Sequence, residues 1–404
     1  MKCDALKAEM TAWRHDFHRH PELGFQEERT AGIVAGLLRS FGLEVHEGIG
    51  GTGVVGVLQR GNGEGSIAFR ADMDALPLGE TGECDHKSTY DGVMHACGHD
   101  GHTSMLLGAA KYLAKAGDFN GRAIFIFQPN EENGFGAKAM IDEGLFNRFS
   151  ADSIFAMHNI PGMEAGHFAT RIGAMTASEA LFEITITARG GHAALPHMGV
   201  DAILVGAELV TALQSIVARK LDPTQHGVVS VTEFITNGRR NVLPGTAGLK
   251  GDARALTPET NAAIEIHMRQ IANGIAKAHD VGINVAYDTV FPAVHNHRDA
   301  VAAAVHAARS SSGVPVVNAD CDPKLFSEDF AHMSNVAPGC FMLIGNGTSG
   351  ANARPLHATD YDFNDEILVP GASYIATLIE EMLDGDRKVQ SLGLASSDPP
   401  DQVI

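Results

Sequence analysis

The middle of the chain, from about residue 178 to residue 295, limits the fold more than any other segment. The spacing of its apolar residues switches repeatedly between the alternation typical of strands and the three-to-four residue repeat typical of helices. The resulting order, βαββαβ, predicts a split βαβ, ferredoxin-like α+β unit that is complete in itself. Six runs carry the pattern: LFEITITA, VDAILVGAELVTALQSIVARK, GVVSVTEF, TAGLKGDARA, ETNAAIEIHMRQIANGIAKAH and INVAYDTV.

The segments on both sides of this unit have a different pattern. Short apolar runs with strand character alternate there with helix-like segments, which is typical of an α/β fold; the runs are IAFRA (67–71), AIFIFQ (123–128), SIFAMH (153–158) and FMLIG (341–345). A ferredoxin-like unit can be inserted into such a domain because its two termini lie close together. We therefore expect a discontinuous α/β domain of residues 1–177 and 296–385, an inserted domain of residues 178–295, and a disordered tail of residues 386–404.

Composition excludes several classes of protein. The formal net charge of −19 would repel phosphate backbones, so we expect a small-molecule partner and no nucleic acid. No apolar run approaches the roughly 20 residues that a membrane span needs, so no membrane association is expected. The first residues carry scattered charges without an apolar core, so they do not resemble a secretory signal. Five irregularly spaced cysteines indicate reduced thiols, and a cytoplasmic location is predicted.

Polar side chains follow three of the predicted strands at the point where each strand ends. Asp72 and Asp74 follow the first run, Glu131 and Glu132 follow the second, and His158 ends the third. In open α/β sheets, functional sites lie outside the carboxyl ends of the strands. We therefore expect these side chains to face one cleft.

The segment GVMHACGHDGHT, residues 92–103, is rich in groups that bind metals. Cys97 and His99 precede a predicted helix and can reach one point if the backbone between them is irregular. Thiolate and imidazole both bind zinc, manganese, cobalt or nickel. Taken alone, the pair is equally consistent with a polar loop that holds a buried cysteine. The glutamate pair and His158 at neighbouring strand ends, with His357 after the last strand, favour a metal site.

One motif does not carry its usual meaning. GIGGTG, residues 48–53, matches the dinucleotide-binding pattern GxGxxG, but a strand and a glycine turn follow it instead of a helix. We expect these glycines to form a turn of the sheet.

Eight motifs together resemble a known family: FHRHPELGFQE, RADMDALP, MHACGHDGHT, FQPNEENGFGA, GGHAALPH, NVLPG, FSEDF and PLHATDYDFNDE. In this order they resemble the dinuclear-metal amidohydrolases of the aminoacylase and carboxypeptidase clan, in the branch of hippurate hydrolase and the auxin-amino acid amide hydrolases. The resemblance extends to about Asp384. It implies a catalytic domain with a mixed sheet flanked by helices, and a lid and dimerisation domain inserted into it.

The resemblance also implies a site and a mechanism. Two divalent ions per subunit, Mn²⁺ or Zn²⁺ with Co²⁺ or Ni²⁺ as further options, would activate a water, and Glu131 would be the general base. The implied metal ligands are Cys97, His99, Glu132, His158 and His357. The implied reaction is hydrolysis of the amide bond of an N-acyl amino acid.

Further roles follow from the resemblance. His192 would be a lid histidine that stabilises the oxyanion from the partner subunit of a homodimer, and Asn241 and Arg254 would contact the substrate. Departures from the family at Asn130 and in GTAGLKGDAR bear on substrate preference. We interpret the remaining polar residues near the motif as groups that orient ligands or the base: Asp72, Asp74 and Asp100, with His95 and His102 as further candidates.

Three alternative functions remain at this point. A cysteine hydrolase would use Cys97 as the nucleophile, with a histidine base. A non-catalytic metal-binding protein would keep the ligands without a base, which Glu131 argues against. Within the same clan, a dipeptidase or carboxypeptidase competes with an N-acyl-amino acid hydrolase.

Overall fold

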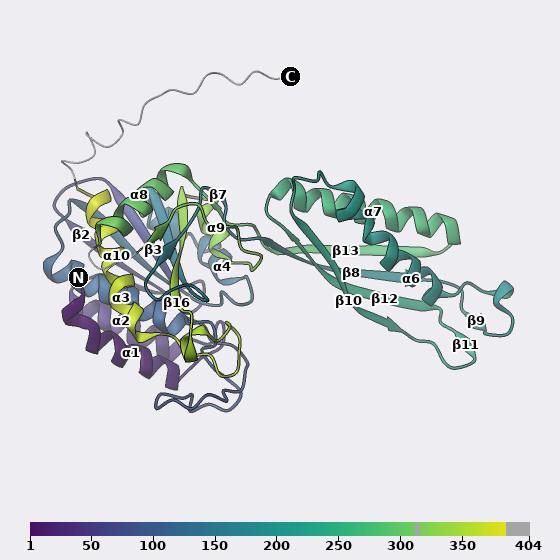
Figure 1. The fold of residues 1–404 in the computed structure, drawn as a ribbon, viewed down its shortest axis with the longest axis horizontal. Coiled ribbons are helices and arrows are strands. Elements are labelled where there is room, and N and C mark those ends of the chain that lie inside the picture. The colour runs from purple at the N-terminus through teal and green to yellow at the C-terminus, as the bar shows by residue number, and fades with distance from the viewer. Residues whose placement is uncertain (312–315, 385–404) are drawn as a thin grey trace, which may run out of the picture.

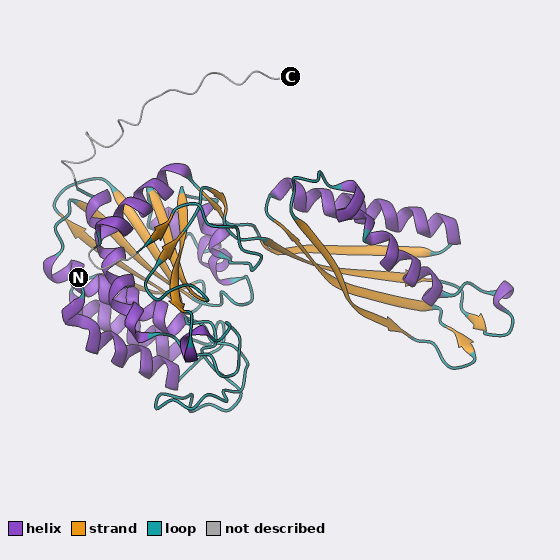
Figure 2. Ribbon diagram, viewed as in Figure 1, coloured by secondary structure: helices purple, strands orange, loops and turns teal. Residues whose placement is uncertain are grey.

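The computed structural model describes residues 1–311 and 316–384, so the tail predicted for residues 386–404 lies outside the described residues. The described chain forms a large part with helices on both faces of a sheet and a smaller part built on a second sheet. Figure 1 shows the two parts side by side, and Figure 2 shows strands and helices in each. Both halves of the predicted fold class are confirmed.

The large part contains an eight-stranded mixed sheet. In spatial order its strands are β1 (Glu44–Ile49), β2 (Gly53–Arg60), β4 (Gly121–Gln128), β3 (Ser66–Asp72), β5 (Ser153–Pro161), β16 (Gly339–Gly347), β6 (Phe168–Ala169) and β15 (Val317–Asn318). The central strands β4, β3, β5 and β16 run parallel to one another. Their carboxyl ends therefore meet at one edge, and they are the four strands that the apolar runs predict.

Helices cover both faces of this sheet because its central strands are apolar on both sides. Along β4, Phe125 and Phe127 belong to one core while Ile124 and Ile126 belong to the other, as the alternation of a strand requires. The first core is completed by α1 (Lys7–Arg19), α2 (Glu28–Phe41), α3 (His99–Ala116), α8 (Arg298–Ser310) and α10 (Leu368–Met382). The second is completed by α4 (Gly136–Asp142), α5 (Leu145–Arg148) and α9 (Phe330–Ser334).

The GIGGTG segment forms the turn between β1 and β2, where Ile49 pairs with Gly53. Gly50 has a φ of 67°, and a Cβ there would lie 2.7 Å from the backbone nitrogen of Met140. Only glycine tolerates both conditions without strain. The prediction of a sheet turn in place of a dinucleotide site is confirmed in its geometry.

The small part has the predicted βαββαβ order. It consists of β8 (Ser178–Thr187), α6 (Ala202–Leu213), β10 (Gly227–Thr236), β12 (Thr246–Ala255), α7 (Pro258–His279) and β13 (Gly282–Phe291). The strands lie in the order β10-β12-β8-β13 and every neighbouring pair is antiparallel. Buried and exposed residues alternate along β8, and the buried ones, such as Ile184 and Ile186, form a separate core with α6 and α7.

Short elements complete the described chain. They are two-stranded ribbons of β9 (Gly191–His192) with β11 (Val242–Leu243) and of β7 (Gly173–Ala174) with β14 (His295–Asn296), a π-helix at Ile216–Lys220, and 3₁₀ turns at Asp4–Leu6, Pro196–Met198, Gly350–Ala353 and Asp365–Ile367. Across residues 1–311 and 316–384, no helix is both long enough and apolar enough to cross a bilayer.

Candidate metal centre

The polar side chains predicted to share a cleft do lie together, beyond the carboxyl ends of the central strands and at the start of α3. Cys97, His99 and His158 offer ligand atoms that lie within 4.8 Å of one another. Cys97 also forms such a group with Glu132 and His357. The Sγ atom of Cys97 lies 3.4 Å from Nε2 of His158. One thiol therefore belongs to both groups, so the cluster has the form of two adjoining sites.

The glycine between Cys97 and His99 allows both side chains to reach this point. Gly98 has a φ of 96° and precedes the first residue of α3. A Cβ at Gly98 would lie 2.3 Å from Oδ1 of Asn159 and 2.8 Å from the hydroxyl of Tyr361. The irregular backbone that the sequence pattern required is therefore present, and it depends on glycine.

Hydrogen bonds to backbone oxygens orient two of the histidines. Nδ1 of His99 lies 2.9 Å from the carbonyl oxygen of Asp74, and Nδ1 of His158 lies 2.7 Å from the carbonyl oxygen of Asn159. Since a carbonyl oxygen only accepts, Nδ1 donates in both rings and Nε2 is the nitrogen available to a metal.

The donor atoms fit a divalent cation. Nε2 of His99 is buried without a hydrogen-bond partner among the described residues, and carboxylate oxygens of Asp72, Glu131 and Glu132 lie 3.8, 4.0 and 3.9 Å from it. Burial lowers the pKa of His99, but the surrounding carboxylates raise it to about 10. The cluster thus favours positive charge at the position where these atoms converge, which a bound cation would supply.

The loop after β4 presents the two glutamates. Asn130 begins this loop with a φ of 48°, and its backbone N–H donates to Oε1 of Glu27 over 2.9 Å. The N–H of Glu132 donates to Oδ2 of Asp74 over 3.0 Å. Oε1 of Glu132 lies 3.4 Å from Nε2 of His357, a residue that also has a positive φ, of 63°. Two left-handed residues therefore bring these ligands together from distant parts of the chain.

The adjacent glutamates differ in their electrostatics. Burial, followed by the charges of Glu328 and Glu132, raises the pKa of Glu131 well above its usual range. Burial also acts on Glu132, but His357 and His99 outweigh it and lower the pKa of that carboxyl. Neighbouring carboxyl groups with opposite shifts are typical of a division into a proton acceptor and an ionised ligand.

Three of the predicted supporting residues, Asp72, Asp74 and His102, lie next to the cluster. Asp74 holds Nδ1 of His99 with Oδ1, 3.2 Å away, and the backbone of Glu132 with Oδ2. Asp72 bonds Nδ1 of His102 with Oδ1 over 2.6 Å, and Nε2 of His102 lies 2.7 Å from Oδ1 of Asn159. Both ring nitrogens of His102 are therefore engaged, which fits a supporting group better than a metal ligand.

The other two candidates, Asp100 and His95, lie near His18 of α1. The side chain of Asp100 interacts with residues of α1 and not with the cluster: its Oδ2 lies 2.9 Å from Nδ1 of His18 and 3.5 Å from Nη1 of Arg14. His95 is buried, and both of its ring nitrogens lack a hydrogen-bond partner within residues 1–311 and 316–384.

Sequence reasoning missed a buried ion network behind the glutamates. Arg70 lies on β3 and pairs with Asp72, Glu328 and Asp329 at 2.7, 2.9 and 3.0 Å. Glu328 in turn is the charged neighbour with the largest effect on Glu131. The signal was present in the sequence, since an arginine inside a fully buried strand needs carboxylate partners.

His192 and Asn241 lie far from the cluster. His192 pairs with Val242 between β9 and β11, and the carbonyl oxygen of Asn241 accepts from the N–H of Ala193. Figure 1 places this ribbon at the end of the small part that is remote from the large part. The structure therefore brings the two residues together with each other, but not with the metal ligands.

Arg254 lies at the opposite end of the small sheet, next to the large part. Its guanidinium pairs with Glu179 over 2.9 Å and donates to the hydroxyl of Ser327 over 2.7 Å. Ser327 precedes Glu328, the residue whose charge raises the pKa of Glu131, so Arg254 bonds to the same segment as that glutamate.

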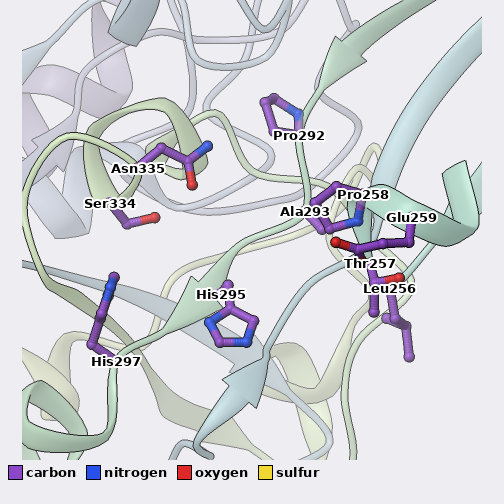
Figure 3. A pocket seen from close by; sticks show the side chains of 10 residues that line it. All are labelled: Leu256, Thr257, Pro258, Glu259, Pro292, Ala293, His295, His297, Ser334 and Asn335. Carbon is purple, nitrogen blue, oxygen red and sulfur yellow. The ribbon is translucent and has the colours of Figure 1, made fainter. Parts of the chain in front are cut away.

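A hollow of about 420 Å³ lies where the chain passes between the two parts (Figure 3). Its lining includes Thr257, Pro292, His295 and Ser334, and none of the predicted site residues. We assign it to the junction of the two parts, because none of the predicted metal ligands lines it.

Known proteins are similar to this chain over nearly its whole length. The chain is 43% identical to hippurate hydrolase of Campylobacter jejuni over 373 residues, which cover 92% of this chain and 96% of that protein. It is 36% identical to thermostable carboxypeptidase 2 of Saccharolobus solfataricus over 366 residues, with coverage of 89% and 91%.

A solved structure has the same fold over nearly the whole chain. It is a Bacillus subtilis protein described as a dinuclear metal-binding peptidase of the M20 family, which superposes with a TM-score of 0.82 at 31% identity and covers 94% of this chain and 99% of its own. The profile of Peptidase family M20/M25/M40 matches residues 68–381. The chain therefore belongs to the M20 family of metal-dependent amidohydrolases and peptidases.

Proposed function

We propose that this enzyme hydrolyses the amide bond of N-acyl amino acids, with hippurate-like and N-acetyl compounds as the first candidates. The observation that carries the proposal is the cluster in which buried Glu131 stands beside Glu132 and His99. The 43% identity to a hippurate hydrolase supports this substrate class.

The proposed cofactor is a pair of divalent ions in each subunit, either Mn²⁺ or Zn²⁺, with Co²⁺ and Ni²⁺ as further options. The residues that would hold the ions are Cys97, His99, Glu132, His158 and His357. When bound, such ions lower the pKa of a water molecule and polarise a carbonyl group. The mixed set of thiolate, imidazole and carboxylate donors suits borderline metals better than Ca²⁺ or Mg²⁺.

Glu131 is the proposed general base and acid. Its carboxylate would accept a proton from the attacking water and return it to the nitrogen of the leaving amine. Its raised pKa favours this role, because a carboxyl group that titrates nearer to neutral pH holds a proton well enough to transfer it. Arg70 and Glu328 pair with each other over 2.9 Å and act on this carboxyl in opposite directions, since the charge of Glu328 raises its pKa and that of Arg70 lowers it.

Arg254 and Asn241 are the proposed substrate contacts, and Arg254 would bind the carboxylate. Asn241 lies beside the β9–β11 ribbon, so it would reach the substrate together with His192. Arg254 already lies at the junction of the two parts through Ser327. A dipeptidase or carboxypeptidase activity is the alternative, and the 36% identity to a carboxypeptidase favours it. Both activities cleave the amide bond to an amino acid. They differ in the acyl group on the other side of that bond, which is itself an amino acid in a peptide.

His192 is the proposed oxyanion donor, acting from the partner subunit of a homodimer. The β9–β11 ribbon points away from the large part of its own chain, so a second subunit is one way to bring it to a cluster (Figure 1). Strand β10 is an edge of the small sheet, and Phe234 and Ile235 on it are 41% and 53% exposed. Ile203 and Leu204 of α6 are also exposed. An unpaired edge with apolar neighbours is suited to symmetric pairing, so we propose that residues 178–295 act as the lid and dimerisation domain.

The decisive experiment is chelation followed by reconstitution, with a panel of substrates. The panel contains N-acetyl, N-benzoyl and indole-acyl amino acids together with dipeptides. We expect activity to disappear on chelation, to return with Mn²⁺ or Zn²⁺, and to be highest on an N-acyl amino acid. Preference for dipeptides would move the assignment to the peptidase alternative, and activity that survives complete metal removal would favour the cysteine hydrolase. A cytoplasmic location remains a prediction.

A further inference from the structure

A second group of metal-binding side chains lies on the other side of the first turn of α3. His18 of α1, Glu80 and Cys84 offer an imidazole nitrogen, a carboxylate oxygen and a thiol sulfur, all within 4.8 Å of one another. Glu80 and Cys84 belong to the segment 77–93, which contains no helix or strand and leads into the motif that carries Cys97. None of the three residues belongs to the cluster described above.

The spacing of the donor atoms fits tetrahedral coordination. Nε2 of His18 lies 3.3 Å from Oε1 of Glu80, and the same oxygen lies 3.6 Å from Sγ of Cys84. With ordinary zinc bond lengths, a tetrahedral site requires roughly 3.4 Å between nitrogen and oxygen and roughly 3.6 Å between oxygen and sulfur. The nitrogen–oxygen distance is also longer than that of most N–H···O hydrogen bonds. Two edges of the tetrahedron are therefore already in place.

The surroundings orient the donors as in known metal sites. Oδ2 of Asp100 lies 2.9 Å from Nδ1 of His18, so Nε2 is directed at Glu80. The N–H of Ser88 donates to Oε2 of Glu80 over 2.7 Å, which leaves Oε1 facing the other two donors. A carboxylate behind a histidine and a held carboxylate ligand are the usual supports of a protein metal site.

The charge of the group also balances on binding. A neutral imidazole, a carboxylate and a thiolate together carry a charge of −2, which one divalent ion would neutralise. The protons that the ligands release on binding would leave to solvent.

We propose that His18, Glu80 and Cys84 form a separate site for one zinc-like divalent ion, with a water as the fourth ligand. Cys84 is only partly buried, which provides access from solvent. The ion fastens segment 77–93 to α1, next to the turn of α3 that carries His99. A neighbouring histidine, His86, is not part of this ligand set, because its Nε2 lies 2.9 Å from Nη2 of Arg14 and 3.0 Å from Oδ1 of Asp362.

The first test counts zinc in purified full-length enzyme after loading with Zn²⁺ and desalting. Cys84→Ser and Glu80→Gln should each hold about one ion per subunit fewer than the unaltered enzyme. Cys321→Ser, which removes a thiol outside both groups of donors, is the matched control and should keep the full content. Cys84→Ser with undiminished zinc would overturn the site and show that the three side chains form a hydrogen-bonded group only.

The second test separates this site from the proposed dinuclear centre. In a Cys97→Ser background, the absorption of Co²⁺-loaded enzyme should still contain a thiolate-to-metal charge-transfer band, and adding Cys84→Ser should remove it. No such band in the Cys97→Ser enzyme would overturn the proposal. Failure of the dinuclear assignment is seen separately, as unchanged metal content in Glu132→Ala.

Discussion

The metal cluster and the β9–β11 ribbon are the two regions that the proposed chemistry must combine, and they are built in opposite ways. In the cluster, His99 and His158 are buried and each has Nδ1 fixed by a backbone oxygen. On the ribbon, His192 is exposed, and its nearby apolar neighbours Leu195 and Met198 are 49% and 65% exposed. In the first region hydrogen bonds orient two histidines before anything binds, whereas the second exposes apolar surface to solvent.

This difference indicates which region would hold the metals and which would close over the substrate. Groups that bind metals must be held at fixed distances, and three of the five proposed ligands, Cys97, His99 and His158, are accordingly buried. A group that closes over a substrate must move or arrive from elsewhere, so it belongs on a separate part with its own core. Variants in the first region should therefore change metal content or the proton transfer itself, and variants in the second should leave metal content unchanged.

The largest effect is expected at Glu131. Glu131→Gln should reduce turnover by roughly 10²-fold to 10⁴-fold, because it removes the proposed proton acceptor, while metal content stays unchanged. Glu132→Ala, one residue away, should lose metal. Metal analysis alongside kinetics separates the two roles, and equal metal loss in both variants would contradict the assignment.

The next largest effect is expected at His192. His192→Ala should lower the rate by roughly 10²-fold to 10³-fold, because one proposed oxyanion donor is lost. His197→Ala, on the same exposed tip, is the control and should have little effect.

Subunit mixing then tests where His192 acts. When inactive His192→Ala and inactive Glu131→Gln exchange subunits, a donor that acts in trans leaves one intact site in each heterodimer, so activity should return. If exchange is demonstrated and activity stays absent, the histidine acts within its own chain. The small part would then have to close over the metal cluster of the same subunit.

A smaller effect is expected at Asp74, which supports two proposed metal-binding residues. Asp74→Asn should weaken metal binding about 10-fold to 100-fold, since it loosens His99 and the backbone of Glu132 together. Titration with Zn²⁺ against a competing chelator measures this change. Asp91→Asn, in an exposed loop, serves as the control, and identical affinities in the two variants would show that Asp74 does not support the site.

The smallest effect concerns stability and pH at Glu27. Burial raises the pKa of this carboxyl to about 7, above the roughly 4.3 of an unfolded glutamate, so the folded state binds more protons between these values. The contribution of the neutral carboxyl to stability is therefore complete below about pH 4 and is lost as pH rises through 7. Glu27→Gln should gain on the order of 1 kcal/mol relative to the unaltered enzyme between pH 5 and pH 8.

Thermal unfolding at the two pH values measures this difference. Gln can still accept from the N–H of Asn130 and donate to the hydroxyl of Thr52, so packing is largely retained. Glu47→Gln on the surface controls for loss of charge. A difference that does not depend on pH would show that Glu27 titrates alike in both states.

The secondary structure was predictable wherever its pattern is long and local. Strands β3, β4, β5 and β16 are apolar on both faces, so they stand out as continuous runs. The ribbon of β9 and β11 was not predicted, because two-residue strands have no period. The gathering of Glu132 and His158 followed from their place at strand ends. The network of Arg70 with Glu328 was missed because the partners are distant in sequence.

The sequence by itself determined the order of the elements, the glycine that lets Cys97 and His99 turn together, and the supply of donor atoms. These depend on backbone preferences and on neighbours along the chain. Tertiary structure decided which donors converge: His99 turns to Asp74 while the adjacent Asp100 turns to His18, and His357 reaches Glu132. It also placed His192 far from the cluster. Such choices depend on packing between segments remote in sequence, which no local pattern records.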